Sequence, residues 1–441
     1  MNCNQKLRLS QIDGSILIVG VDIAKNFHVV RAQDSRGIEY CKGIKFDNDK
    51  EGFKKFEGWK NKVMKIAKKD KVIIGMEPTG PYWFTLARWL KQNKYWIVTV
   101  NPAHVKKSKE LDDNNQAKTD YRDARVIAQL VKEGRFSEPN LLQGVYEELR
   151  NAKNLRRLIL KNSTRTKNQI DNWFVRYFPE YSKAYTSWES KSFICVMKKY
   201  KLPGVIAKLS PQKLYCEVKK VVPRGVGIRK ITDLIKVCSN SIGMTSGLHM
   251  AGKELEYLLK QYEESVFDIE NIETTIEDLC EELPEVKILM QIKGISTTTA
   301  SGIVAEYGSI QNYKTSKQMI KMAGLSLTEN SSGIKKGKMS ISKRGRKDLR
   351  KILFLAMLGM IKNNPEFHDL YLYYRHRAKN QLNGKQAMVV LMIKLIRIIH
   401  TIVTRNIDYN KELMVNTIIR PKEFIMHKYP VGVSPSVVQN V

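Results

Sequence analysis

Four carboxylates occupy positions from which they could act together on one phosphate. Asp22 ends the apolar run SILIVGVD and Glu77 ends the run KVIIGME. Asp120 and Asp123 are three residues apart in KTDYRDAR, a spacing that places both on one face of a helix. An acid that leaves the carboxyl end of a buried strand points into the crevice where open α/β sheets bind ligands. The sequence therefore predicts one crevice lined by these four acids.

Carboxylates gathered in one crevice repel each other unless cations lie between them. Hard oxygen ligands favour magnesium or manganese, and two such ions would clamp the attacking and leaving oxygens of a phosphodiester. Each acid also has an ordinary interpretation: Asp22 would begin a turn, Glu77 would be a loop acid, and Asp120 would be a helix N-cap. The order strand-Asp, strand-Glu, helix Asp-x-x-Asp favours the shared metal site.

The elements that must position these acids alternate in the first 140 residues. The apolar patterns predict strands over 15–22, 26–34, 38–46, 71–77 and 95–100, and helices over 50–68, 81–92 and 119–134. Three strands followed by alternating helices and strands describe a mixed sheet covered by helices. This order is typical of the ribonuclease H-like (RuvC-like) fold, which we expect over residues 1–140.

The charge of the chain is large and uneven. Its 441 residues include 76 Lys and Arg against 44 Asp and Glu, a net charge of +32 that indicates a polyanionic partner. Residues 252–284 run against this trend, with eleven acids and two lysines. Apolar residues recur there every three or four positions, which predicts a coiled coil or a helical hairpin. We expect this helix to join protomers in a homodimer or homotetramer. The residues of the seam are Leu255, Leu258, Tyr262, Ile269, Ile272, Ile276, Leu279 and Leu283.

Composition excludes several other classes of protein. Hydrophobic residues make up 42% and charged residues 27% of the chain, which excludes general disorder. The most apolar stretch, 387–403, is interrupted by Lys394 and Arg397, so no membrane span is expected. Six cysteines without a CxxC pair give no zinc or disulfide framework. With no signal peptide pattern at the N-terminus, we expect a cytoplasmic, nucleoid-associated protein of a bacterium or archaeon.

Two basic features in the C-terminal half suit a nucleic acid. Lys293 and Gly294 lie in a turn between predicted helices over 284–291 and 297–307. Such a turn presents free N–H groups to a phosphate, although it would equally be a tight turn without a ligand. Residues 335–351 hold nine Lys or Arg and one acid, interleaved with glycine and serine, which suits a loop moulded to a sugar-phosphate backbone. The candidate backbone contacts there are Lys335, Lys336, Lys338, Lys343, Arg344 and Arg346.

Four motifs carry a more specific resemblance. The segments VGVDIAK, GMEPTGPYWFTLARWL, VNPAHVKKSK and KTDYRDARVIAQL resemble the DEDD transposases of insertion sequences, a family that includes the Piv DNA invertases. Some of its members are recombinases guided by a bridge RNA that the element encodes. The resemblance continues through 158–170 and 284–404 but fails over about 180–250, a longer or divergent insert. It implies that Asp22, Glu77, Asp120 and Asp123 bind the metal, and that 285–416 contains a helix-hairpin-helix element.

The resemblance also implies a nucleophile. The family has a serine-glycine pair, a basic loop and then serine-lysine-x-glycine, which Ser332-Gly333 and Ser342 to Gly345 match. The serine that becomes linked to DNA maps onto Ser332, with Ser331 as a one-residue rival. Serine needs a base or a metal to activate it, and no histidine lies near it in sequence. We expect the metal site to activate it while Lys335, Lys336 and Arg344 stabilise phosphate charge.

Together these patterns predict four segments: a catalytic domain over 1–140, a helical region over 141–284, a transposase domain over 285–416 and a tail over 417–441. The expected function is a DNA transposase or recombinase that uses magnesium, donor and target DNA and a guide RNA. A metal-dependent nuclease of the junction-resolvase type, in which water attacks, is the alternative. A non-catalytic nucleic-acid binding protein is a third possibility, against which the four acids argue.

Overall fold

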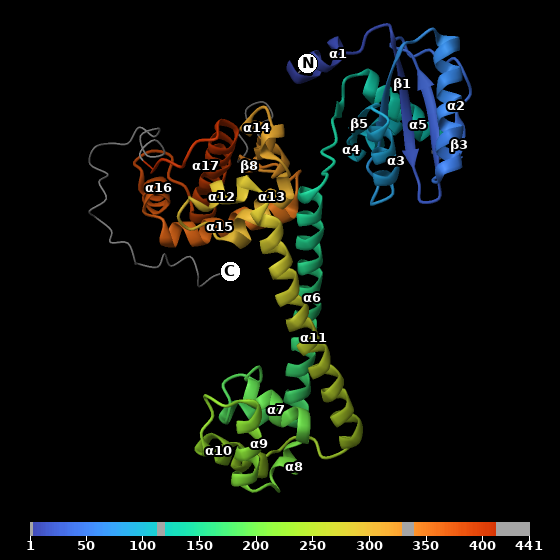
Figure 1. Ribbon diagram of the computed structural model, residues 1–441. Coiled ribbons are helices and arrows are strands. Elements are labelled where there is room, and N and C mark those ends of the chain that lie inside the picture. The colour runs from blue at the N-terminus through green and yellow to red at the C-terminus, as the bar shows by residue number, and fades with distance from the viewer. Residues whose placement is uncertain (1–2, 113–119, 329–338, 412–441) are drawn as a thin grey trace. The chain divides into compact units, whose positions relative to one another are not determined.

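The computed structural model describes residues 3–112, 120–328 and 339–411. The chain divides into two compact units, Met1–Leu141 and Leu142–Val441 (Figure 1). Five residues singled out from the sequence lie outside the described residues, as does the tail over 417–441. These five are Ser331, Ser332, Lys335, Lys336 and Lys338.

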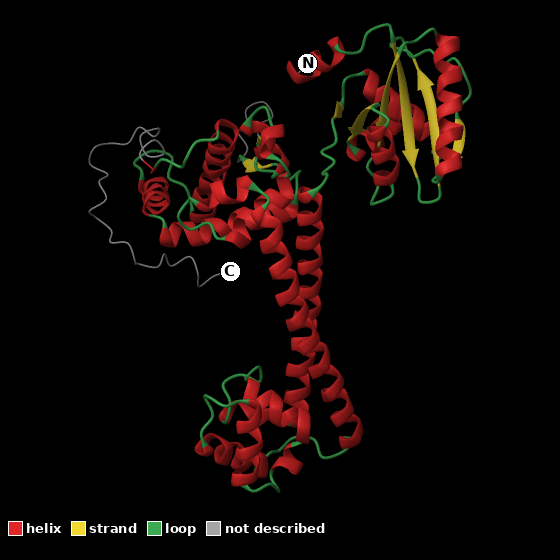
Figure 2. Ribbon diagram, viewed as in Figure 1, coloured by secondary structure: helices red, strands yellow, loops and turns green. Residues whose placement is uncertain are grey.

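The first unit is built on a mixed sheet, as the sequence predicts, and this sheet has six strands rather than the five expected (Figure 2). Strands β1, β4 and β5 are parallel, whereas β2, β3 and β6 join through antiparallel pairs. In sheet order the strands are β3 (Ile44–Asp47), β2 (Phe27–Gln33), β1 (Ile16–Ile23), β4 (Lys71–Met76), β5 (Trp96–Val100) and β6 (Phe136–Ser137). The helices are α1 (Cys3–Ser10), α2 (Lys50–Ala67), α3 (Trp83–Gln92), α4 (Pro102–Asp112) and α5 (Asp120–Lys132).

Helix α5 lies unusually close to the sheet because two strands have glycine beneath it. A Cβ on Gly20 of β1 would lie 2.1 Å from the carbonyl oxygen of Ala124. A Cβ on Gly75 of β4 would lie 2.3 Å from a methyl of Val131. Val126, Ile127 and Val131 of α5 are buried in the core cluster on this face of the sheet, while α2 and α3 contribute to the cluster on the other face. The glycines therefore set the depth at which α5 presents its first turn.

The structure differs from the sequence prediction at four places in this unit. The third strand begins at Ile44, because the segment before it is a loop, and α1, α4 and β6 are additional elements. Helix α4 begins with Pro102, for which the missing N–H of proline is harmless at a first helical position. The side chain of Asn101 accepts a hydrogen bond from the N–H of Ala103 at 2.9 Å and so caps this helix.

The second unit is organised by two long antiparallel helices, α6 (Val145–Tyr177) and α11 (Leu248–Glu281), which lie side by side (Figure 1). Arg156 forms an ion pair with Glu273, and Arg176 pairs with Glu254 at 2.9 Å. Leu255 and Leu258 of the predicted seam are buried in one core cluster with residues of α6, and Ile276 in another. The apolar seam therefore packs within one chain, in a helical hairpin, and its partner is α6 rather than the second protomer that we expected.

This packing gives an expected result for Ile276→Glu. Ile276 is 5% exposed in the core that it shares with Leu149, so a carboxylate there should cost about 3 kcal/mol or more and lower the melting temperature. The mass measured by light scattering should not change. Thr275→Glu, one residue away on the exposed side, should leave both properties unaltered. A loss of oligomers at an unchanged melting temperature would contradict the within-chain packing.

The insert between these two helices has its own core of short helices. They are η1 (Pro179–Lys183), α7 (Lys191–Tyr200), α8 (Pro203–Ile206), α9 (Pro211–Val221) and α10 (Ile228–Ser239). Trp173 and Phe174 of α6 pack in this core with Phe193 of α7. Pro203 and Pro211 begin two of these short helices, because proline is favoured at the first helical position.

The C-terminal helices form the remaining core. They are α12 (Pro284–Met290), α13 (Thr297–Tyr307), η2 (Ile310–Asn312), α14 (Ser316–Met322), α15 (Lys347–Asn363), α16 (Pro365–His376) and α17 (Gly384–Arg405), with a two-stranded sheet of β7 (Leu327–Thr328) and β8 (Ser340–Ile341). Among the described helices, only α17 is long and apolar enough to cross a membrane. Its residues Leu391, Leu395 and Ile399 are buried in this core, so α17 is used as a core helix.

Candidate active site

Two of the four predicted acids leave neighbouring strands at the same edge of the sheet. Val21 of β1 is paired in parallel register with Met76 of β4. The residues that follow this pair are Asp22 and Glu77, and both are half-buried. The parallel register therefore brings these two carboxylates to the same place, as their positions at the ends of two apolar runs suggested.

The other two acids come from the first turn of α5. Asp123 is 8% exposed, whereas Asp120 is exposed. Burial raises the pKa of Asp22 to about 6, and repulsion from Asp123 and Asp120 adds to this effect. Glu77 adds a smaller repulsion of the same sign, and its own pKa is raised by burial and by Asp123. The structure thus brings Asp22 within electrostatic range of the other three acids, and Glu77 within range of Asp123.

A lysine that the sequence analysis missed lies among these acids. The Nζ of Lys109, on α4, is 2.5 Å from an Oδ of Asp123, and its positive charge opposes the raised pKa of both Asp22 and Glu77. Arg122 donates a hydrogen bond to the carbonyl oxygen of Lys109 at 3.0 Å, which ties α4 to α5. No signal in the sequence separates Lys109 from the other lysines of HVKKSK.

The donor chemistry of these four side chains fits a hard divalent cation, since all are carboxylates. In the described part of the chain, no three acid, histidine or cysteine side chains converge closely enough to enclose an ion. The ammonium of Lys109 supplies the neighbouring positive charge instead. The residues available to hold a divalent ion are Asp22, Glu77, Asp120 and Asp123.

The raised pKa of Asp22 predicts how Asp22→Asn should affect stability. The ordinary pKa of an aspartate is about 4, so the folded state holds this proton more tightly than the unfolded chain does. Asp22 should therefore weaken folding as pH rises from about 4 to 6, and the cost is fully present at pH 7. Without divalent ions, Asp22→Asn should raise stability by about 1 kcal/mol at pH 7, after allowance for partial exposure.

Thermal melting at several pH values measures this effect. The gain from Asp22→Asn should disappear near pH 4, and Asp70→Asn, just before the opposite end of β4, should show no such gain. An equal gain in stability at pH 4 and pH 7 would contradict a raised pKa of Asp22 as its cause.

The turn with Lys293 and Gly294 joins two helices, α12 and α13, that pack on each other. Gly294 has a φ of 95°, and a Cβ there would lie 3.2 Å from the Cα of Met360, so this position requires glycine. The side chain of Lys293 is exposed, and its carbonyl oxygen accepts a hydrogen bond from Asn364 at 2.9 Å. The turn is thus held against α15 while the Lys293 ammonium faces solvent.

The residues on either side of the segment that carries Ser331 and Ser332 are paired as strands. β7 precedes this segment and β8 follows it, and the two strands are antiparallel partners. Beside them, a Cβ on Gly345 would lie 2.4 Å from the backbone nitrogen of Gly324. Position 345 therefore requires glycine, because the two backbone segments cross in close contact. Lys343 and Arg344, two of the predicted phosphate contacts, are exposed next to this crossing.

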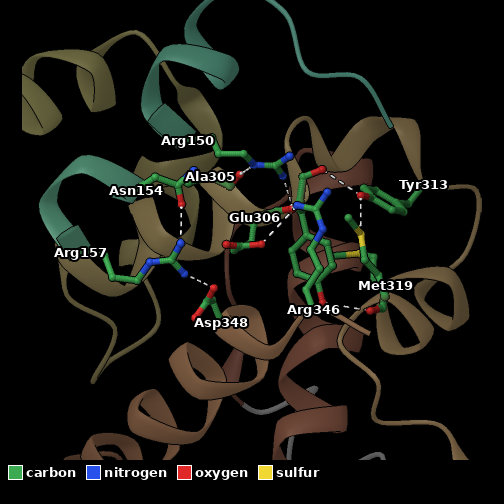
Figure 3. A network of polar contacts seen from close by, with 11 residues as sticks. Arg150, Asn154, Arg157, Ala305, Glu306, Tyr313, Met319, Arg346 and Asp348 are labelled. Atoms are coloured by element: carbon green, nitrogen blue, oxygen red, sulfur yellow. Dashed lines mark hydrogen bonds and ion pairs between the residues drawn. The ribbon is translucent and has the colours of Figure 1, made fainter. Parts of the chain in front are cut away.

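Arg346, in contrast, is half-buried and bonded to other residues of the protein (Figure 3). Its guanidinium donates to the carbonyl oxygen of Glu306 and pairs with the carboxylate of that residue at 3.2 Å. Arg150 donates to the carbonyl oxygens of Ala305 and Glu306 at 2.8 and 2.6 Å. Two cations therefore meet the C-terminal end of α13, where the helix dipole is negative. We leave Arg346 out of the proposed nucleic-acid surface for this reason.

Two family models match this chain. A model for the DEDD transposases of IS110, described as "Transposase", covers residues 19–179, and a model described as "Transposase IS116/IS110/IS902 family" covers residues 286–372. The first contains all four acids of the crevice, and the second contains the α12–α13 turn and the segment with Ser332. Together they match more than half of the chain, and neither covers the insert.

Curated relatives agree with these matches. The chain is 21% identical to the insertion element IS110 uncharacterized 43.6 kDa protein of Streptomyces coelicolor, over 60% of this chain and 66% of that protein. It is 28% identical to the transposase for insertion sequence element IS1111A of Coxiella burnetii, over 39% of this chain and 47% of the relative. It is 27% identical to the pilin gene-inverting protein of Moraxella bovis, over 29% of this chain and 39% of that protein.

The alignments thus span two thirds or less of each relative's own length. DEDD transposases typically use divalent metal ions, which agrees with the carboxylates at the ends of β1 and β4 and in the first turn of α5. The resemblance read from the four sequence motifs is confirmed: this chain belongs to the IS110 family of insertion-sequence transposases.

Proposed function

We propose that this protein is a recombinase of an insertion sequence that cuts and rejoins DNA strands through the four-carboxylate crevice and a serine. The observation that carries the proposal is the placement of Asp22 and Glu77 at neighbouring strand ends, where burial and repulsion from Asp123 raise the pKa of both. Asp120 and Asp123 join them from the first turn of α5. Of these four carboxylates, Asp123 has a cationic partner in Lys109. Neighbouring carboxylates without enough positive charge destabilise a fold, so their placement is best explained by a cationic ligand.

In this proposal the four acids hold magnesium or manganese, with two ions as the expected number. The bound ions would supply Lewis-acid stabilisation of the phosphate oxygens. Lys109 balances the charge of Asp123 before an ion binds, because its ammonium already lies 2.5 Å from that carboxylate. Asp123 is held at its depth by the close packing of α5 on Gly20.

Ser332 is the proposed nucleophile. Its Oγ forms a bond to phosphorus as one P–O bond of the DNA breaks, the hydroxyl proton leaves, and the departing DNA oxygen takes up a proton. The resulting phosphoserine ester conserves the bond energy, so that a second DNA hydroxyl can reverse the step. Lys335, Lys336, Lys338, Lys343 and Arg344 would neutralise backbone charge around this serine. Lys293 and Gly294 would bind a further phosphate, in a helix-hairpin-helix element.

We also propose that a structured guide RNA and at least a second protomer take part. The support for RNA is a charge surplus larger than one duplex site requires, together with the family resemblance. The support for a homodimer or homotetramer is the chemistry, because exchange of two duplexes needs more than one nucleophile. With the α11 seam covered by α6, the contact between protomers must lie elsewhere.

One reconstitution tests both the activity and the RNA. The protein is purified from its native host with its nucleic acids and incubated with donor and target DNA, and joined products are sequenced. We expect joining with magnesium, none with chelator, and loss of joining after ribonuclease treatment. Joining that survives ribonuclease would point to direct readout of DNA by the protein, and metal-dependent cutting without joining would favour the nuclease.

A further inference from the structure

The insert carries a second basic feature, which neither family model covers. Residues 180–250 hold thirteen Lys and Arg against four Asp and Glu. Five of these cations, and no acid, fall between Lys219 and Thr232, where α9 turns into α10. We call this segment, residues 219–232, the basic hairpin.

The basic hairpin is a well-anchored structure. Helices α9 and α10 pack on each other, and Val226 at the turn is 7% exposed in the core of the insert. Lys219 donates a hydrogen bond to the carbonyl oxygen of Pro223 at 2.8 Å. Lys230 lies over the ring of Tyr185, 4.3 Å from its centroid. Two of the five cations are thus used to hold the turn in place.

The other three cations point to solvent. Lys220, Arg224 and Arg229 are exposed, and within the described ranges none of them makes an ion pair or a side-chain hydrogen bond. Three like charges on one short turn repel each other, and nothing in the packing of the insert requires them. Their placement therefore indicates a ligand with negative charge.

Three lysines at the end of α7 give a contrast, because each is paired with an acid. On α7, Lys198 pairs with Glu263 at 2.7 Å and Lys199 pairs with Glu217 at 2.9 Å. Lys201, just after α7, pairs with Glu256 at 2.5 Å. Two of these three acids belong to α11. These three lysines have acidic partners, whereas Lys220, Arg224 and Arg229 of the basic hairpin have none among the described residues.

Apolar side chains are exposed beside the three free cations. Val221 is 67% exposed and Ile228 is 40% exposed, one on each side of the turn. Cations beside small apolar groups suit a sugar-phosphate backbone, in which charged phosphates alternate with apolar sugar surface. An acidic protein segment would match the cations but has no regular apolar surface between its charges.

We propose that the basic hairpin is a nucleic-acid binding site, separate from the catalytic unit, that contacts the backbone of duplex DNA or of a structured RNA. The site needs neither the four acids nor Ser332, so it goes beyond the recombinase proposal. The site would hold one nucleic acid at the insert. Helices α9 and α10 and the core of the insert would give it a rigid base.

Lysine footprinting on the full chain tests the site directly. The protein, in chelator so that no cleavage occurs, is acetylated alone, with a 30-base-pair DNA, with a stem-loop RNA, or with poly-glutamate. We expect Lys220 to lose reactivity with DNA or RNA, and Lys198 and Lys199 to keep theirs. The arm that protects at the lower concentration identifies the nucleic acid. Protection by poly-glutamate alone, or by no polymer, would overturn the proposal, whereas a failed recombination assay would leave it standing.

A charge-matched pair of variants gives the second measurement. Lys220→Gln, Arg224→Gln and Arg229→Gln together should weaken binding to the protecting nucleic acid about 10- to 100-fold near 0.15 M salt, and should lower the salt slope by about two to three. The control combines Lys198→Gln, Lys199→Gln and Lys201→Gln, which removes the same charge from lysines that already have partners. Equal losses in the two variants, with both folded by circular dichroism, would mean that only net charge matters and would overturn a specific site.

Discussion

Replacing Asp22, Glu77, Asp120 or Asp123 by Ala should reduce DNA cleavage at least about a hundredfold while the protein still binds DNA. Each replacement removes one of the oxygen donors that the proposed ions need. The loss should raise the free energy of the transition state far more than that of the bound DNA substrate. DNA affinity should change little, because phosphate contacts come from the basic residues. Cleavage of a labelled duplex and its retention on filters measure the two properties separately.

Two controls make this result specific to the crevice. Asp70→Ala lies at the opposite end of β4 from Glu77 and should cleave normally. Asp123→Ala breaks the ion pair with Lys109 and should be checked by melting, since an unpaired half-buried lysine destabilises a fold. Full cleavage by any of the four variants, or full cleavage in chelator, would contradict the metal site.

Much of the first unit could be predicted from the sequence because its signals are local. Apolar runs mark β1, β4 and β5, and the meeting of Asp22 and Glu77 follows from the common direction of β1 and β4. Lys109 could not be predicted, because its place beside Asp123 depends on how α4 docks on α5 through Arg122. The depth of α5 depends on Gly20 and Gly75, and a glycine in a strand does not reveal which helix it faces.

The helical unit shows a different limit. The apolar repeat of α11 predicts a partner helix but does not say whether it comes from the same chain. The structure supplies α6, whose ion pairs with Glu254 and Glu273 fix the antiparallel register. Likewise, the charge of Lys220, Arg224 and Arg229 is plain in the sequence, but only the structure separates them from lysines that have partners.

Ser332→Ala should abolish both cleavage and joining while leaving DNA binding within about 1 kcal/mol, roughly one hydrogen bond, of the unchanged protein. Without the Oγ there is no atom to form the phosphoserine ester, and the four acids alone cannot conserve the bond energy. Ser331→Ala is the matched control, one residue away, and should keep its activity. If Ser331→Ala is inactive and Ser332→Ala is active, the mechanism stands and the residue assignment is wrong.

The most direct measurement is the trapping of a covalent protein–DNA adduct. With magnesium and a duplex that carries a nick near the cleavage site, the strand needed for resealing dissociates, so the ester should accumulate. Trypsin and mass spectrometry should then place a nucleotide on the peptide between Lys321 and Lys335, which contains Ser331 and Ser332, with fragmentation assigning it to Ser332. The adduct should be absent from Ser332→Ala and from Asp22→Ala. Cleaved DNA with free ends and no adduct on any serine would contradict the account and identify a water-driven nuclease.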